Sequence, residues 1–481
     1  MVKYIYYYSC VIWLMILSAT GLQAQVVLPK VFTDHMVLQQ GKKVPVWGTA
    51  APGAAITVRF QEQVKPAIAD EQGRWSVQLD ELTASKEPNQ LVVQSLKDKV
   101  TFRDVLIGEV WLVSGQSNME YSMHNHPQYA KPKKGDPDLL EKAFKAANDP
   151  LIRVLYVEKN LKSDVLPTNG WQKVSPAALA PVSAIGYFYA KALVDSLDVP
   201  VGIISSSWGG TSIETWTPSE AYAASSVFGS QLEGEQLHGE TVGIRYNKMI
   251  APIAPYSLRG FLWYQGETNL IRGDIGNYAD KKKVLIEAWR KSWEDDTLPF
   301  YYVQLAPYSY SQRRNDAVVN TWEALPKFWE VQYDCLAIPY TGMVSTTDLV
   351  DDVKDIHPSY KWIIAERLAR LALAKDYGYE GLPYNGPTFK KMTVADDHIL
   401  LTFDHAAEGL FTPNGEDPTW FVIKHKSGNY QKAKARIEGN TVVIQREKHH
   451  LPVVRFAWDE LAMPNLYNKA GLPALPFRTD K

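Results

Sequence analysis

Short apolar runs alternate with longer helical patterns through the middle of this 481-residue chain. The apolar runs lie at 110–113, 201–205, 260–264, 299–305 and 342–345. Segments with helical periodicity precede the second run, separate the last three and follow the fifth. Strands that alternate with helices form a parallel sheet with helices on both faces. The pattern therefore predicts an α/β fold whose sheet contains these five strands.

The two flanking parts of the chain have a different pattern. In residues 25–105 and 381–481, short apolar runs alternate with Gly, Pro, Asn and Asp at close spacing, which is typical of antiparallel β-sandwiches. We predict an N-terminal β-sandwich domain at 25–105, an α/β domain at 106–380 and a C-terminal β domain at 381–481. The pattern leaves open whether the two β modules form one sandwich or two.

The first 24 residues have the pattern of a secretory signal peptide. Lys3 precedes an apolar stretch, Cys10–Leu17, and "LQA" precedes Gln25. The alternative is a membrane anchor, but this apolar stretch is shorter than a bilayer-spanning helix requires. We predict cleavage after residue 24, export, and no stable membrane insertion after cleavage.

Cysteine content and charge limit the compartment and the partners. The chain has two cysteines, and the predicted cleavage removes Cys10, so Cys335 has no internal disulfide partner. An exported protein without disulfides fits a bacterial periplasm or cell exterior. The formal net charge is −2, without the basic surface of a nucleic-acid-binding protein. The sequence carries no signal for an oligomeric state.

Polar residues follow every predicted strand of the parallel sheet. Ligands of such sheets bind at the carboxyl ends of the strands, so these segments are expected to meet. In strand order they are "SGQSNM", "SSWGGTS", "QGETN", "APYSY" and "TTDLVDDVKDIHP". Together they supply a serine, two adjacent glycines, side-chain amides and an Asp-His pair. This inventory predicts a hydrolase site.

The serine, histidine and aspartate suggest nucleophilic catalysis. A serine hydroxyl needs a base to remove its proton, which makes Ser117 the candidate nucleophile and His357 the candidate base. Asp355 lies two residues before the histidine and is the candidate for orienting the imidazole. Asp348 and Asp352 are alternatives if their loop folds back.

An ester carbonyl attacked by serine becomes an oxyanion, which needs fixed hydrogen-bond donors. The candidates are the backbone N–H of Ser117, a backbone N–H within Gly209-Gly210, with Gly210 preferred, and the side-chain amide of Gln265. Glycine suits the second position because the missing Cβ allows close approach of the backbone. Asn269 is an alternative amide donor and also a candidate substrate-binding residue.

Two further residues are candidates for substrate binding. Trp208 precedes the glycine pair and either forms a wall of a sugar pocket or packs beneath it. Arg245 carries a planar guanidinium that suits bidentate recognition of a substrate carboxylate. No cluster of carboxylates or thiols has the spacing of a metal site, so we expect neither a metal nor a cofactor.

Six separated blocks occur in the order found in a known family. They are "VFTDHMVLQQ", "GEVWLVSGQSNME", "GIISSSWGGTSIETWT", "GFLWYQGETN", "DIHP" and "NLYNKAGLPALPFRTD". On these blocks the chain resembles the sialate O-acetylesterases, a branch of the SGNH or GDSL-like hydrolases. The resemblance implies a flavodoxin-like domain, with Ser117 as nucleophile, His357 as base, and Gln265 and a glycine of the third block in the oxyanion hole. The related esterases share the Asp-x-His-Pro motif, which favours Asp355 as the acid that orients His357.

The expected function follows from the residues and the resemblance together. We expect an exported serine esterase that removes O-acetyl groups from sialic acids through an acetyl-enzyme intermediate. One alternative keeps the chemistry and changes the substrate to a plant or host polysaccharide such as xylan or pectin. A second alternative is a catalytically inactive carbohydrate-binding protein on a hydrolase scaffold.

Overall fold

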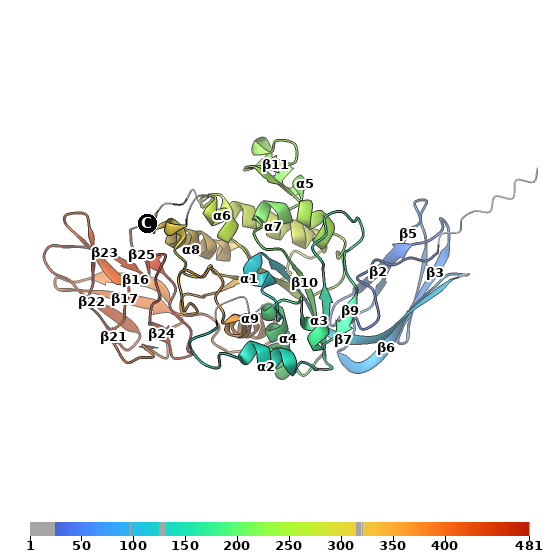
Figure 1. Ribbon diagram of the computed structural model, residues 1–481, viewed down its shortest axis with the longest axis horizontal. Helices are drawn as coiled ribbons and strands as arrows, with labels where there is room; N and C mark the ends of the chain where they lie inside the picture. Colours follow the sequence, from blue (N-terminus) through green and yellow to red (C-terminus); the bar gives the residue numbers. More distant parts are fainter. Residues whose placement is uncertain (1–24, 97, 125–130, 314–318, 320, 481) are drawn as a thin grey trace, which may run out of the picture.

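Three parts follow one another along the long axis of the molecule (Figure 1). A β module lies at each end, and an α/β domain lies between them. The structure is a computed structural model, and it describes residues 25–480 except 97, 125–130, 314–318 and 320. The predicted signal peptide, residues 1–24, lies outside the described residues. Among the described residues, no helix is both long enough and apolar enough to cross a bilayer.

The central sheet has the strand order β15-β14-β13-β7-β10-β8-β9, and all neighbours are parallel except β9. Its strands are β7 (Lys99–Gly115), β8 (Ile152–Tyr156), β9 (Trp171–Lys173), β10 (Val201–Ser207), β13 (Gly260–Tyr264), β14 (Phe300–Val303) and β15 (Thr341–Val344). All five predicted strands are present. The sequence analysis missed β8, because the buried Arg153 interrupts its apolar run, and the short β9.

The five predicted strands have the order 2-1-3-4-5 across the sheet, which is the flavodoxin order. The α/β fold class is therefore confirmed. β7 is the first of these strands and lies in the interior of the sheet. The chain continues to β10 on one side of β7 and to β13 on the other. The carboxyl end of β7 is thus at the topological switch point, where such sheets bind ligands.

Helices cover both faces of this sheet (Figure 1). On one face α4 packs against α9, and on the other α7 packs against α8. The helices are α1 (Ser117–Glu120), α2 (Leu139–Lys145), α3 (Pro176–Leu179), α4 (Ala184–Leu197), α5 (Ser219–Ala223), α6 (Glu267–Ile271), α7 (Tyr278–Ser292), α8 (Ala324–Asp334) and α9 (Lys361–Asp376). Short 3-10 helices lie at Ile213–Trp216, Gly229–Gln231, Tyr310–Gln312 and Cys335–Ala337, and a π-helical turn at Tyr246–Ile250.

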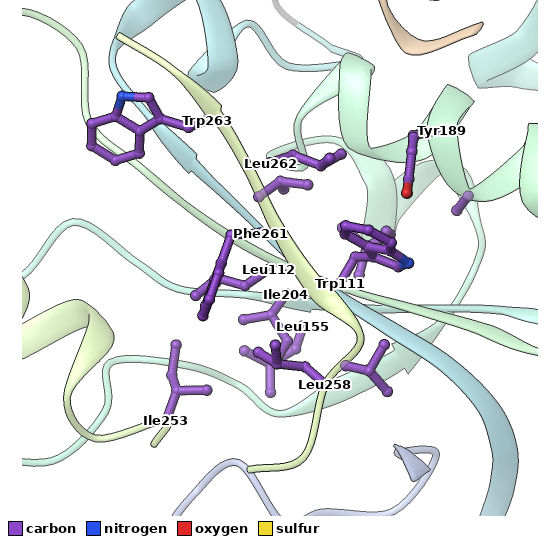
Figure 2. Close-up of a cluster of buried hydrophobic side chains, with 14 of the residues drawn as sticks. Trp111, Leu112, Leu155, Tyr189, Ile204, Ile253, Leu258, Phe261, Leu262 and Trp263 are labelled. Carbon is purple, nitrogen blue, oxygen red and sulfur yellow. The ribbon is translucent and has the colours of Figure 1, made fainter. Parts of the chain in front are cut away.

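Large aromatic side chains fill the space between the sheet and its helices (Figure 2). On β7, Trp111 meets the ring of Tyr189 from α4 edge-on at 5.3 Å. On β13, Phe261 meets Trp289 of α7 at 5.4 Å, also edge-on. Edge-to-face pairs of this kind stabilise a core beyond the area that they bury. The strands that carry the site loops are therefore held from both faces.

The N-terminal β module is joined to the α/β domain through a shared strand. Residues 99–107 of β7 pair with β6, and residues 109–115 pair with β10 or β13. One continuous hydrophobic core extends from Val26 to Leu373. The predicted domain boundary at 105/106 falls inside β7. The module's other strands are β1 (Val37–Gln39), β2 (Val44–Thr49), β3 (Ala55–Phe60), β4 (Gln63–Ile68), β5 (Arg74–Leu79) and β6 (Ser85–Gln94).

The C-terminal β module has a hydrophobic core of its own, which includes Ile399, Phe421, Phe456 and Phe477. It lies at the opposite end of the molecule from the N-terminal module, so the two do not form one sandwich (Figure 1). Its strands are β16 (Thr388–Val394), β17 (His398–Asp404), β18 (Leu410–Phe411), β19 (Phe421–His425), β20 (Tyr430–Lys432), β21 (Ala435–Glu438), β22 (Thr441–Gln445), β23 (His450–Phe456), β24 (Tyr467–Asn468) and β25 (Phe477–Arg478).

Candidate active site

A sharp turn at the end of β7 presents Ser117. Gly115 ends the strand at φ +142°, and a Cβ there would lie 2.1 Å from the carbonyl oxygen of Tyr264 on β13. Only glycine tolerates both the dihedral angle and the contact. Two residues later Ser117 begins α1, half-buried at the edge of the sheet. The turn therefore places the hydroxyl where the strand would otherwise have continued.

The structure brings Ser117 and His357 together across 240 positions of sequence. The hydroxyl Oγ of Ser117 lies 3.0 Å from Nε2 of His357, within hydrogen-bond distance. A carboxylate oxygen of Asp355 accepts the backbone N–H of His357 at 2.9 Å and lies 3.7 Å from Nδ1 of its ring. The His357 side chain is 22% exposed, so a substrate can reach the pair.

The two alternative acids have other partners. The Asp348 carboxylate is bound by the guanidinium of Arg367 at 2.8 and 2.6 Å, and one of its oxygens accepts from Tyr467. Asp352 accepts the backbone N–H of Lys354 at 2.9 Å. A bidentate pair with arginine fixes a carboxylate strongly. Asp355, by contrast, lies within ion-pair distance of the His357 ring, which favours it over Asp348.

The two glycines after β10 differ in their surroundings. A Cβ on Gly209 would lie 3.2 Å from Cβ of Ser117, and its N–H donates to the carboxylate of Glu120. Gly210 is exposed, with φ +70°, and a Cβ there would meet no atom within 4 Å. Within the described part of the chain, the N–H groups of Gly210 and Ser117 make no hydrogen bond. Gly209 thus permits the close approach, whereas Gly210 keeps a free donor.

Gln265 does not fit the predicted role in an oxyanion hole. Its side chain is fully buried, and its Nε2 donates to the carbonyl of Thr211 at 3.1 Å and to Oδ1 of Asn269 at 2.7 Å. Its Oε1 accepts from the hydroxyl of Tyr278 at 3.0 Å. A primary amide has only two N–H donors, and both are used. The geometry therefore argues against an oxyanion contact by this side chain.

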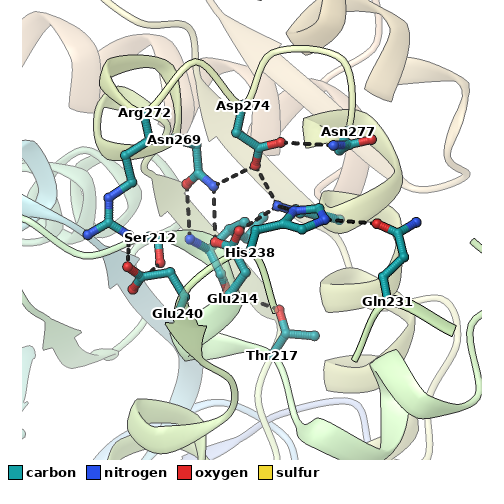
Figure 3. Close-up of polar contacts among 12 residues, drawn as sticks. Ser212, Glu214, Thr217, Gln231, His238, Glu240, Asn269, Arg272, Asp274 and Asn277 are labelled. Carbon is teal, nitrogen blue, oxygen red and sulfur yellow. Dashed lines mark hydrogen bonds and ion pairs between the residues drawn. The ribbon is translucent and has the colours of Figure 1, made fainter. Parts of the chain in front are cut away.

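Asn269 was predicted to contact a substrate, but its side chain is not available for that contact. It is 1% exposed, and its Nδ2 donates to Glu214 at 3.0 Å and to Asp274 at 3.1 Å. Its Oδ1 accepts from Gln265 and from the backbone N–H of Ile213. The amide therefore makes all four of its hydrogen bonds inside the protein, and Figure 3 shows those to Glu214 and Asp274.

The same network contains ligand types that suit a metal. One ligand atom each of Glu214, His238 and Asp274 lies within 4.8 Å of the others (Figure 3). The ammonium of the fully buried Lys281 donates to all three, at 2.5, 2.9 and 2.6 Å respectively. An ammonium has three N–H donors, so it occupies the place of a cation among these groups. His238 joins β11 (Gln236–Leu237) to β12 (Glu240–Thr241). The cluster is an ion network that supports the loop after β13.

Trp208 and Arg245 lie together beside the glycine pair. The backbone N–H of Trp208 donates to the carbonyl of Gly115 at 3.0 Å, and the guanidinium of Arg245 stacks on its ring at 4.9 Å. In the described part of the chain no carboxylate forms an ion pair with Arg245, and its buried Nε has no hydrogen-bond partner. Burial lowers the pKa of Arg245 from its usual value. A guanidinium that has no carboxylate partner among the described residues can bind an anionic group of a substrate.

The sequence analysis missed a cluster of three hydrogen-bonded, buried side chains next to Ser117 and His357. Asn118 donates to Glu267 at 2.6 Å and to the carbonyl of Ile356 at 3.0 Å, and it accepts from the ammonium of Lys361 at 2.6 Å. Burial raises the pKa of Glu267 and lowers the pKa of Lys361 to about 7. Asn118 and Glu267 lie in two of the blocks quoted above, but a lysine at the start of a helix pattern gives no signal of burial.

Comparison with known proteins assigns the chain to a family. Residues 107–373, more than half of the chain, match the family described as "Carbohydrate esterase, sialic acid-specific acetylesterase". The chain belongs to this family. The esterase is 26% identical to sialate O-acetylesterase of Homo sapiens, over 92% of this chain and 90% of the human protein. It is 27% identical to that of Mus musculus, over 78% of each chain.

The esterase also resembles a solved structure over nearly its whole length. The crystal structure of a carbohydrate acetylesterase from Xanthomonas citri superposes with a TM-score of 0.82 at 33% sequence identity. The match covers 95% of this chain and 100% of that chain. These comparisons make the protein a carboxylic ester hydrolase, an acetylesterase that acts on sugars, and confirm the family resemblance drawn from the six sequence blocks.

Proposed function

We propose that the protein is a serine esterase that removes O-acetyl groups from sialic acids, with Ser117 as nucleophile and His357 as general base. The observation that carries the mechanism is the 3.0 Å distance between Oγ of Ser117 and Nε2 of His357. Asp355 holds the histidine loop and supports the imidazolium from 3.7 Å. A nucleophile, a base and an orienting acid in this relation are the requirements of nucleophilic acyl transfer.

In the first half-reaction, His357 takes the proton of Ser117 while Oγ attacks the acetyl carbonyl carbon. The carbonyl oxygen becomes an oxyanion, and the free N–H groups of Ser117 and Gly210 are the proposed donors to it. The intermediate then collapses and the C–O bond to the sugar breaks. The leaving sugar oxygen takes the proton from His357, which leaves an acetyl ester on Ser117.

In the second half-reaction, His357 removes a proton from a water molecule, and the resulting hydroxide attacks the acetyl-enzyme. The second oxyanion uses the same backbone donors. Its collapse breaks the bond between Oγ and the acetyl carbon, Oγ regains the proton, and acetate leaves. No residue outside the site has to move a proton.

Arg245 supports a sialic acid as the substrate. Sialic acids carry a carboxylate, as do the galacturonic acid units of pectin, whereas the acetylated xylose units of xylan carry no charge. A guanidinium on an aromatic ring, without a carboxylate partner in the described part of the chain, favours an anionic sugar over xylan. Trp208 follows Ser207 of β10 and precedes Gly209, so the guanidinium of Arg245 stacks on the loop that approaches Ser117.

Replacing Arg245 with leucine is expected to change substrate preference more than catalysis. Loss of a charge-assisted contact should lower kcat/KM for an O-acetylated sialic acid by about 10- to 100-fold. The value for 4-nitrophenyl acetate, which has no carboxylate, should change by less than about twofold. Acetate release from both substrates by wild type and R245L gives the comparison.

Wild-type acetate release should also be compared between O-acetylated sialic acids and acetylated xylan and pectin. Preference for the polysaccharides would contradict the proposed substrate and leave the serine mechanism standing. If R245L lowers kcat/KM equally for both esters, Arg245 supports the structure of the site and does not recognise the carboxylate. Sugar binding without any acetate release would favour the inactive carbohydrate-binding alternative.

Export is part of the proposal and has a separate measurement. The pattern of residues 1–24 supports cleavage before Gln25 and a periplasmic or extracellular location in a bacterium. Expression of the full chain in a bacterial host should give a protein outside the cytoplasm, with the intact mass of a chain that starts at Gln25. A cytoplasmic protein that retains Met1–Ala24 would contradict export.

A further inference from the structure

Three buried polar side chains form a chain behind Ser117 and His357. Asn118 follows the nucleophile, Glu267 begins α6, and Lys361 begins α9, and none is more than 2% exposed. Buried charges are costly unless paired and hydrogen-bonded. Their position next to both reacting side chains suggests a role beyond packing.

The chemistry of the neighbours fixes the orientation of the Asn118 amide. Lys361 only donates hydrogen bonds, so Oδ1 of Asn118 must face its ammonium, at 2.6 Å. Ionised Glu267 only accepts them, so Nδ2 faces its carboxylate, at 2.6 Å. With its ends assigned in this way, Asn118 directs the second hydrogen of Nδ2 to the carbonyl of Ile356, at 3.0 Å.

This second hydrogen bond ties the two catalytic loops together. Ile356 immediately precedes His357, and Asn118 immediately follows Ser117. The bond from Asn118 to Ile356 therefore links the backbone beside the nucleophile to the backbone beside the base. The bond to Ile356 depends on the orientation of the Asn118 amide. That orientation depends in turn on Lys361, the donor that faces the amide oxygen.

We propose that Lys361 is a positioning residue, whose buried ammonium locks the Asn118 amide and thereby holds His357 at hydrogen-bond distance from Ser117. The inference rests on the proposed roles of Ser117 and His357. Lys361 acts through Asn118 and does not touch the substrate.

The surroundings of Lys361 hold its side-chain nitrogen between two aromatic rings. The rings of Tyr121 and Tyr264 lie 4.8 and 5.6 Å from its nitrogen, within the range of cation–π contacts. Glu267 and Asp355 are the acids whose charge favours the ammonium, and burial opposes it. Burial is the larger effect and lowers the pKa of Lys361 to about 7, but its amine and its ammonium both carry N–H groups that can donate to Oδ1 of Asn118.

The variant Lys361→Met tests the proposal, and Lys282→Met is its matched control. Lys282 is also fully buried and lies 3.3 Å from the centre of an aromatic ring, that of Tyr302 on β14, but it belongs to α7. We expect K361M to lower kcat for 4-nitrophenyl acetate by about 100-fold, since displacement of a catalytic group by about 1 Å costs that much. KM should stay within about twofold of the wild-type value, and K282M should keep kcat within about twofold.

A second variant of Lys361 and a double-mutant cycle with Asn118 distinguish an effect on the position of His357 from an effect on folding. K361Q retains a donor for Oδ1 of Asn118 and should recover part of kcat. If Lys361 acts through Asn118, the double variant N118A/K361M should lose no more activity than the worse single variant. Circular dichroism identifies unfolded variants.

Three outcomes would overturn the inference: wild-type kcat in folded K361M, additive losses in the cycle, or unfolding of both K361M and K361Q while K282M folds. An active S117A variant would instead overturn the proposed function. Failure of one proposal is thus distinguishable from failure of the other.

Discussion

Alanine in place of Ser117 is expected to lower kcat for acetate esters by about 10⁴-fold or more, because the variant has no nucleophile to form the acetyl-enzyme. The fold should persist, since the only side-chain hydrogen bond that the structure assigns to Ser117 within the described residues is the one to His357. Initial rates with 4-nitrophenyl acetate, together with thermal unfolding of both proteins, measure the two effects.

Trapping gives an independent readout of the same step. Rapid acid quench of wild type during turnover should yield a protein heavier by one acetyl group, and peptide mapping should place that group on Ser117. S117A should carry no acetyl group. Wild-type rates in the folded S117A variant, or acetylation at another residue, would remove Ser117 from the mechanism.

Replacement of His357 with alanine is expected to have the second largest effect, about 10⁴-fold on kcat, since the same ring serves both half-reactions. The double variant S117A/H357A should be no slower than S117A alone, because residues that act as a unit are not additive. D355N should cost less, about 10- to 100-fold, because its carboxylate lies 3.7 Å from the ring and is 29% exposed.

Asp348 provides the matched control for Asp355. Its carboxylate pairs with Arg367 and both side chains are 9% exposed, so D348N should lower the free energy of unfolding by about 3 kcal/mol, as broken buried ion pairs do. Its kcat should stay near that of wild type. A greater loss of kcat in D348N than in D355N would make Asp348 the acid that supports His357.

The sheet and the Ser117–His357 pair were predictable because they depend on local patterns. Apolar runs that alternate with helices determine a parallel sheet, and the residues after those runs must then gather at one edge. β8 did not show this pattern, because Arg153 lies within it and is buried against Asp104 and backbone carbonyls. Such a partner is distant in sequence and invisible in a window of a few residues.

The amides of the fourth block, "GFLWYQGETN", show why part of the site was not predictable. Gln265 and Asn269 follow a strand, as catalytic donors do, but their hydrogen bonds are used by Thr211, Glu214 and Asp274. Whether a polar residue at a sheet edge faces the substrate or the interior depends on these tertiary partners.

The shared strand has a mechanical consequence for the whole enzyme. β7 is 17 residues long and passes without a break from the N-terminal module to the turn that presents Ser117. The N-terminal module and the turn that presents Ser117 therefore share one strand and one hydrophobic core. A shortened enzyme that began at Lys99, the start of β7, would lack β6 and leave the amide groups in the first half of β7 unpaired, so the N-terminal module is part of the framework that positions Ser117.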